Sequence, residues 1–248
     1  MATQIDAIRT EITAAARTAC RLGFPAAIVL AAVAALAFVL GITTPVRSGP
    51  YCTGLCMTYP YAEAGAFFPR DYLWMPLAML IAPLFTVVVA CLHFCVPVRG
   101  KPFSLLAVSF AAISTAVLVP DYLVQLLVVQ ASLMHGEMAG IALLTQYNAH
   151  GVFIALEDAG YLLMALAFLP AAAGVPVSIR PGAWVRWTFG AAFVLAMLAF
   201  AGLGLRFGPE MGLPFELAII LIAWIAVVVA AIELTVFFRR AGKAETIR

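Results

Sequence analysis

The sequence predicts an all-α, polytopic membrane protein with six transmembrane helices and both termini in the cytoplasm. Of the 248 residues, 65% are hydrophobic and only 10% are charged. A soluble domain is usually about one quarter charged and about half apolar, so the bilayer is the natural solvent for this chain. Two further patterns support this fold class: six apolar runs of helical length, and an uneven distribution of lysine and arginine between the segments that join them.

The six apolar runs are the predicted spans. A helix needs roughly 20 mostly apolar residues to cross a bilayer, and each run is about that long or longer. Proline and glycine punctuate the gaps between the runs. The spans form one predicted membrane domain over residues 23–238, and they cover residues 23–42, 73–96, 103–131, 150–174, 185–205 and 215–238.

Lysine and arginine orient the predicted bundle. Of the 14 such residues, eleven fall in segments on one side, and only Arg47, Arg70 and Arg206 fall on the other. Positive residues near membrane spans stay in the cytoplasm. The richer side is therefore inside, and it includes both termini and the basic cytoplasmic tail 239–248. The charge rule and the even number of spans agree.

The N-terminal segment 1–22 has its own pattern. Ile5, Ile8 and Ile12 recur at helical spacing opposite polar residues, which predicts an amphipathic helix on the inner membrane surface. A straight extension of the first span is the alternative and is equally well supported. The apolar run that follows is longer than a signal-peptide core and has no small-residue cleavage site after it, so we expect a retained span.

Two pairs of cysteines differ in their predicted surroundings. Cys52 and Cys56 lie in the long loop 43–72, which is predicted outside, where an oxidising compartment would allow a disulfide that staples the loop. Cys91 and Cys95 are one helical turn apart in the second span. Buried helical cysteines usually act as small apolar residues, and a thiol-redox role for the pairs is the weaker alternative.

The third span carries a polar stripe. Its members are separated by seven, four and seven residues, which places them within about 40° of one another around a helix. Pro120 removes one backbone hydrogen bond beside them and leaves a carbonyl acceptor without its helical donor. We therefore expect a ligand pocket next to the stripe, which consists of Ser114, Asp121, Gln125 and Ser132, with Tyr122 beside it.

Two adjacent carboxyls interrupt the fourth span. The stretch TQYNAHGVFIALEDAGYLLM, residues 145–164, contains Glu157 and Asp158 in an otherwise apolar run. Ionisable groups inside a membrane are rare and mark a functional site by default. His150 precedes Glu157 by seven residues and Tyr161 follows it by four, so the three are expected to share one helical face.

The polar groups of the third and fourth spans are expected to meet in the outer half of the bilayer. Counting about 1.5 Å per residue from the span ends puts Asp121, Gln125, Glu157 and Asp158 at matching depth. Such carboxyls suit a proton-coupled site or general acid and base chemistry. The alternative is that they only hydrogen-bond the helices together. The segment between the two spans would cap the site with His135, Glu137, Gln146, Tyr147 and Asn148.

Other polar residues carry weaker signals. Glu216 follows Pro214 at the predicted start of the sixth span, where the helix dipole favours an acid, so we interpret it as structural. We expect no metal site, because the chain has no HExxH motif, no paired histidines and no cysteine and histidine cluster with zinc spacing. No pattern identifies a catalytic residue, a cofactor or an oligomeric state.

The run LLTQYNAHGVFIALEDAGYLLMALAFL, residues 143–169, resembles a stretch in an uncharacterised family of bacterial multi-span (six-helix) integral membrane proteins. The resemblance is confined mainly to these residues. It implies a multi-pass protein of the bacterial cell (inner) membrane, and it implies no activity.

These observations predict binding of a small molecule or ion at a carboxylate-lined cavity in the outer half of the bilayer, with transport of that ligand left open. The predicted roles are proton or cation coupling by Asp121, Glu157 and Asp158, and ligand orientation by Gln125, Tyr122, Tyr161 and His150. Two alternatives stay open: a membrane-embedded enzyme that uses the same carboxyls as general acid and base on a lipid or isoprenoid, and a non-catalytic scaffold or complex subunit. The net charge of +2, without a basic patch interleaved with aromatics, excludes nucleic acid and leaves the lipid bilayer and a small-molecule or lipid ligand as partners.

Overall fold

The computed structural model describes residues 2–178 and 180–244, and within these ranges every regular element is a helix. The prediction of an all-α fold is confirmed for this part of the chain. Six stretches are long and apolar enough to cross a membrane, as predicted. The principal helices are α1 (Ala2–Ile42), α2 (Met75–Cys95), α3 (Lys101–Leu123), α6 (Val152–Gly174), α7 (Gly182–Phe207) and α8 (Gly212–Ala244).

Short elements connect the principal helices. They are η1 (Ala62–Phe67), η2 (Arg70–Tyr72), η3 (Val98–Gly100), η4 (Val124–Val129), α4 (Gln130–His135), α5 (Ile141–Leu144) and η5 (Gly208–Glu210). Together with the principal helices they make up the six candidate spans: Ala14–Ile42, Arg70–Cys95, Val98–His135, Val152–Gly174, Gly182–Glu210 and Gly212–Lys243. Five of the six spans are longer than the predicted apolar runs because turns at their ends remain helical; Pro76 and Pro102, for example, lie in the first turns of α2 and α3. The fourth span, Val152–Gly174, is two residues shorter than its predicted run.

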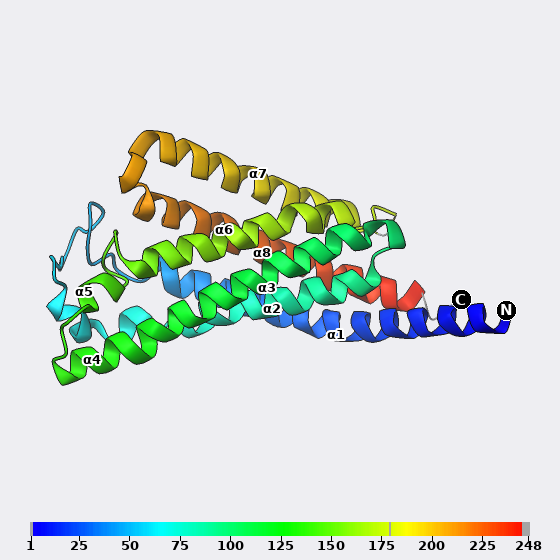
Figure 1. Cartoon of the computed structure of the whole chain (residues 1–248), viewed down its shortest axis with the longest axis horizontal. Coiled ribbons are helices and arrows are strands. Elements are labelled where there is room, and N and C mark those ends of the chain that lie inside the picture. The colour runs from blue at the N-terminus through cyan, green and yellow to red at the C-terminus, as the bar shows by residue number, and fades with distance from the viewer. Residues whose placement is uncertain (1, 179, 245–248) are drawn as a thin grey trace.

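The long helices run side by side as one bundle, and Figure 1 shows the first turns of α1 and the last turns of α8 at the same end. We call this the inner end, following the charge prediction, and we call the end with α4 and α5 the outer end. α3 packs most extensively against α6, and α1 packs against α8 and α2. α1 is a single helix from Ala2, so residues 2–22 continue the first span without a break, as the alternative of a straight extension predicts. The side chains of residues 2–13 lie outside the described part of the chain.

α3 and α6 approach closely because Gly160 has no side chain. A Cβ atom there would lie 2.4 Å from Cγ and Cδ2 of Leu118. Ser114 Oγ crosses the same contact and donates a hydrogen bond to the Gly160 carbonyl at 2.8 Å. This contact sets the separation of α3 and α6, the two helices that carry the predicted acids. Asp121 lies one turn beyond Leu118 on α3, and Glu157 lies one turn before Tyr161 on α6.

The third span changes its helical winding just after Pro120. α3 ends at Leu123, and η4 is a π-helical segment that leads into α4. The Val124 N–H contacts both the Asp121 and the Pro120 carbonyls. A proline cannot supply the usual backbone donor, and π-helical turns frequently occur at functional sites. The expected irregularity beside Asp121 is therefore present as a wider turn.

Candidate functional site

Four carboxyls from three helices gather inside the outer half of the bundle. Asp121 of α3 is 2% exposed, Glu157 of α6 is fully buried, and Asp158 of α6 is half-buried. The fourth is Glu216 of α8, whose carboxyl lies within hydrogen-bonding reach of Glu157. Asp121 and Asp158 lie close enough for their charges to interact with Glu157. The structure thus brings together the three acids predicted from the sequence and adds a fourth.

A chain of hydrogen bonds leads into this acid cluster, by which we mean Asp121, Glu157, Asp158 and Glu216. The Tyr122 hydroxyl donates to Oε1 of Glu157. The Tyr161 hydroxyl lies 2.9 Å from that of Tyr122, and Trp224 Nε1 donates to the Tyr161 oxygen at 2.7 Å. Because the Tyr122 proton is directed at Glu157, Tyr161 is the donor to Tyr122. Every bond of the chain therefore points its hydrogen toward Glu157.

The acid cluster has no cationic partner within the described residues. None of its four members forms an ion pair with a lysine, arginine or histidine there. Each also has one buried oxygen without a donor from the protein: Asp121 Oδ2, Glu157 Oε2, Asp158 Oδ1 and Glu216 Oε2. Buried polar atoms are almost always satisfied, so these oxygens call for protons, water or a ligand.

A hollow of about 440 Å³ lies at the outer end and meets the acid cluster at Glu216. Trp224 of α8 also lines the hollow, so two residues are shared between the hollow and the buried network. Trp74 lies across from Trp224, with ring centroids 6.1 Å apart. The remaining wall comes from α1, the segment 44–48, Gln146 and Tyr147, and the apolar face of α8. We call this hollow the outer pocket.

The only cation in the described lining of the outer pocket is Arg47, and it is already paired. Its Nε lies 2.8 Å from Oδ2 of Asp71, which is 1% exposed, and its guanidinium lies 4.2 Å from the centre of the Phe67 ring. The pocket is therefore lined by Glu216 and by two tryptophan side chains. An aromatic wall with a nearby carboxyl suits a cation.

Gln125 is buried but supports the outer segment and does not face the acids. Its Nε2 donates to the Leu144 carbonyl, and its Oε1 accepts from the Gln146 N–H at 3.1 Å. Asn148 Nδ2 donates to the Ala142 carbonyl at 2.7 Å within the same segment. Gln125 therefore fixes the backbone of the segment that brings Gln146 and Tyr147 to the pocket. Burial raises the pKa of the Tyr147 phenol well above its ordinary value, so this group stays neutral.

His150 corrects one sequence prediction. It was expected on the same helical face as Glu157, but α6 begins only at Val152, so the helical spacing does not extend to it. Its Nε2 lies 2.6 Å from Oε2 of Glu210, and both side chains are mostly exposed, at 64% and 70%. His150 therefore joins the start of α6 to the turn between α7 and α8, and it lies outside the acid cluster.

Glu216 is the site residue that sequence reasoning assigned to another role. It was interpreted as a first-turn acid because the span was taken to begin near Pro214. α8 begins at Gly212, so Glu216 is the fifth helical residue and lies beyond the reach of a first-turn effect. The signal that identifies it is its place before a long apolar run that has no lysine or arginine until Arg239.

The structure also places the remaining predicted residues. Cys52 and Cys56 form a disulfide in the outer loop, with Cα atoms 5.8 Å apart. Ser132 and Glu137 contact each other near the outer surface and lie outside the acid cluster. Within residues 2–178 and 180–244, no three histidine, cysteine, aspartate or glutamate side chains are placed to hold a metal ion. Comparison of the chain with known protein families, curated proteins and solved structures gives no match.

Proposed function

We propose that this chain is a multi-pass protein of the inner cell membrane that binds a small organic cation at the outer pocket, in exchange for a proton of the acid cluster. The observation that carries the proposal is the position of Glu216. It lines a hollow of about 440 Å³ and also lies within hydrogen-bonding reach of the buried Glu157. One residue therefore links the space for a ligand to the cluster of uncompensated acids.

The Glu157 and Glu216 pair has a definite proton requirement. Two ionised carboxylates cannot hydrogen-bond to each other, so the Glu157 and Glu216 pair needs one shared proton. Tyr122 donates to Oε1 of Glu157 and can stay its donor while the shared proton moves. A cation that pairs with Glu216 supplies the positive charge that the proton supplied before. The proton then leaves Glu216 for water in the pocket, and the total charge of the site is conserved.

The walls of the pocket support an amphiphilic cation over a simple ion. Trp74 and Trp224 line the pocket, and tryptophan is the aromatic side chain that attracts cations most strongly. Leu217 and Leu221 line the pocket and are about half exposed on the side of α8 that faces lipid. An ammonium group with an apolar part would contact the indoles and Glu216 with its charge and the leucines with its apolar part.

The test measures binding and proton release together. The probe is benzylammonium, with benzyl alcohol as the neutral analogue, added to purified protein in weakly buffered detergent with a pH dye. We expect the wild type to bind benzylammonium and release a proton, and Glu216→Gln to lose about tenfold or more in affinity. Glu210→Gln is the matched control, because it removes the same charge from an exposed residue at the outer end.

The outcomes separate the proposal from its competitors. Equal affinity of Glu216→Gln and Glu210→Gln for benzylammonium would show that the outer pocket is not the binding site. Binding of benzyl alcohol as tight as that of benzylammonium would show that charge plays no part. In proteoliposomes, uptake of labelled benzylammonium driven by an opposing pH gradient supports transport. Binding without uptake restricts the function to binding.

A second candidate is a membrane-embedded enzyme that acts on a lipid or isoprenoid. The observation that favours it is the apolar wall of the outer pocket, which includes the lipid-facing Leu217 and Leu221. In that case Glu157 and Glu216 would act as general base and general acid. Conversion of an added polyprenyl phosphate, followed by mass spectrometry and lost in Glu157→Gln, would favour this function. A scaffold role, the third possibility, needs neither a hollow nor uncompensated acids.

A further inference from the structure

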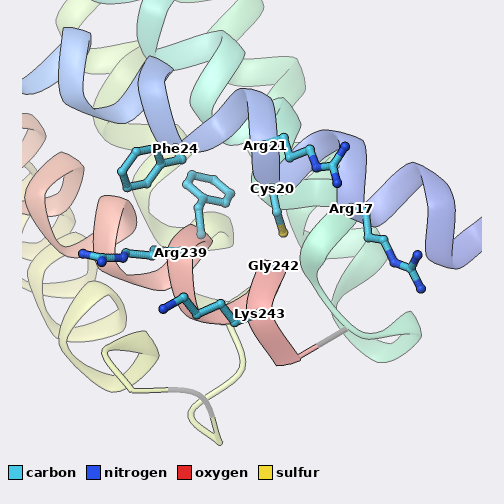
Figure 2. A pocket seen from close by; sticks show the side chains of 8 residues that line it. Arg17, Cys20, Arg21, Phe24, Arg239, Gly242 and Lys243 are labelled. Atoms are coloured by element: carbon cyan, nitrogen blue, oxygen red, sulfur yellow. The ribbon is translucent and has the colours of Figure 1, made fainter. Parts of the chain in front are cut away.

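A second hollow, of about 400 Å³, lies at the inner end between the first part of α1 and the last part of α8. It is separate from the acid cluster, which lies in the outer half of the bundle. Figure 2 shows four basic side chains around it, Arg17 and Arg21 from α1 and Arg239 and Lys243 from α8. No described residue of the lining is acidic. We call this hollow the inner pocket.

Three of these cations have no ion pair within the part of the chain that the structure describes. Arg21, Arg239 and Lys243 are exposed and form no ion pair with any described residue. Two other inner-end arginines are held by backbone carbonyls instead. Arg186 donates to the carbonyls of Ala172 and Ala173 at the end of α6, and Arg240 donates to the Arg180 carbonyl. The positive-inside rule explains why all of them lie at this end. It does not explain why one subset surrounds a hollow.

The floor of the inner pocket is aromatic and apolar. Phe238 is 1% exposed and Phe24 is half-buried, and both line the hollow. Leu22, which follows Arg21 on α1, is 56% exposed. A cationic rim above an apolar floor matches a molecule with an anionic head and hydrocarbon chains. Free phosphate or a soluble nucleotide would find cations here but no use for the apolar floor.

The cations lie in two separate groups. In Figure 2 the guanidinium groups of Arg17 and Arg21 point to one side of the hollow, and Arg239 and Lys243 point to the other. Arginine binds phosphate oxygens through parallel N–H donors, so two separate groups of cations suit two phosphates better than one. Two phosphates joined by a short polar linker would place one anion beside each group.

We propose that the inner pocket binds the head group of an anionic phospholipid of the inner leaflet, with preference for a lipid that carries two phosphates, such as diphosphatidylglycerol. Basic pockets between membrane helices on the cytoplasmic side are the recognised type of site for such head groups. Each phosphate pairs with the cations of one helix, and the acyl chains follow the apolar faces of α1 and α8. The lipid thereby joins the first span to the last.

The test uses native mass spectrometry of the full chain in detergent, titrated with one lipid at a time. The arms are diphosphatidylglycerol, phosphatidylglycerol, phosphatidylcholine and pyrophosphate. We expect diphosphatidylglycerol to bind most tightly. The double variant Arg21→Gln, Arg239→Gln removes one cation from each helix and should weaken that binding about 30-fold, since each cation near an anionic head group contributes about fivefold.

The matched control is Arg99→Gln, Arg180→Gln, which removes two exposed cations from the same end outside the pocket. It should change the affinity less than about twofold. Equal losses of lipid affinity in the two double variants would show that the lipid is attracted to the whole inner face. That result would overturn the proposal of a site in the inner pocket. Binding of pyrophosphate as tight as that of the lipid would assign the pocket to a soluble anion and overturn the lipid. The single variants Arg21→Gln and Arg239→Gln keep the test decisive if the double variant is not folded.

Discussion

At the outer end, four carboxyls lie inside the bundle on α3, α6 and α8, whereas at the inner end four cations surround a surface hollow between α1 and α8. The acids are held by buried donors such as Tyr122, and the space between their helices is fixed by close contacts. The cations extend on long side chains from exposed positions. The comparison teaches that the acid cluster is part of the packed core, while the inner pocket can change its charges without changing the fold.

The largest expected effect comes from a glycine beside the acid cluster, and a glycine of the inner pocket provides the comparison. Gly160→Ala brings a Cβ atom to 2.4 Å from the Leu118 side chain between α3 and α6, so these helices must separate or repack. We expect the free energy of unfolding to fall by about 2 to 3 kcal/mol, the cost of overpacking a closely packed core. The measurement is denaturation of the purified protein by SDS in mixed micelles, followed by circular dichroism.

Gly242→Ala is the matched control in the inner pocket. Among the described residues, its nearest neighbour would be Cβ of Cys20 at 3.7 Å, which is an ordinary contact. Alanine also has the higher helix propensity, and we expect a change of no more than about 1 kcal/mol in either direction. Similar large losses in both variants would contradict the view that Gly160 lies in a tight helix contact and Gly242 does not.

A smaller effect is expected from Tyr122→Phe. The substitution removes the donor to Glu157 and the acceptor for Tyr161, and it leaves both buried groups with one partner fewer. We expect a loss of about 1 to 2 kcal/mol in the free energy of unfolding, together with weaker binding of benzylammonium at the outer pocket. The same denaturation and binding measurements apply.

The control for this prediction is Tyr59→Phe, because Tyr59 is exposed in the outer loop and its hydroxyl has no contact with the acid cluster. It should leave both quantities unchanged. If Tyr122→Phe behaved in the same way, the hydrogen-bonded chain from Trp224 to Glu157 would contribute nothing to the fold or to the site.

Helical spacing and the charge rule predict much of this arrangement from the sequence. Asp121, Glu157 and Asp158 come together because their depths can be counted along two adjacent spans that face each other. The prediction for His150 was wrong because α6 begins after it, so helical spacing does not relate it to Glu157. The interpretation of Glu216 as a first-turn acid was wrong because α8 begins before Pro214. A shift of a few residues in a helix end changes which residues share a face, and single-sequence patterns locate helix ends least well.

The outer and inner pockets lie beyond what such patterns can predict. Each hollow joins α1 to α8, the first and last spans, and no local spacing relates residues so far apart in sequence. The charge rule explains the position of every inner cation in the same way and does not separate those of the inner pocket from the others. The contacts distinguish Arg186 and Arg240, which donate to backbone carbonyls, from Arg21 and Arg239, which line the inner pocket.

The smallest expected effect comes from salt, which should act differently on the inner pocket and on the acid cluster. Raising NaCl from about 0.05 to about 0.5 M shortens the Debye length severalfold, which screens exposed charges strongly and buried contacts little. The affinity of the inner pocket for diphosphatidylglycerol should therefore fall by about fivefold or more. The loss of unfolding free energy in Tyr122→Phe should change by less than about 0.5 kcal/mol, because that hydrogen bond is buried. Native mass spectrometry at low salt cannot follow this series, so lipid binding is measured with a fluorescent analogue in nanodiscs. A salt-independent lipid affinity would mean that the aromatic floor, rather than the four cations, holds the lipid.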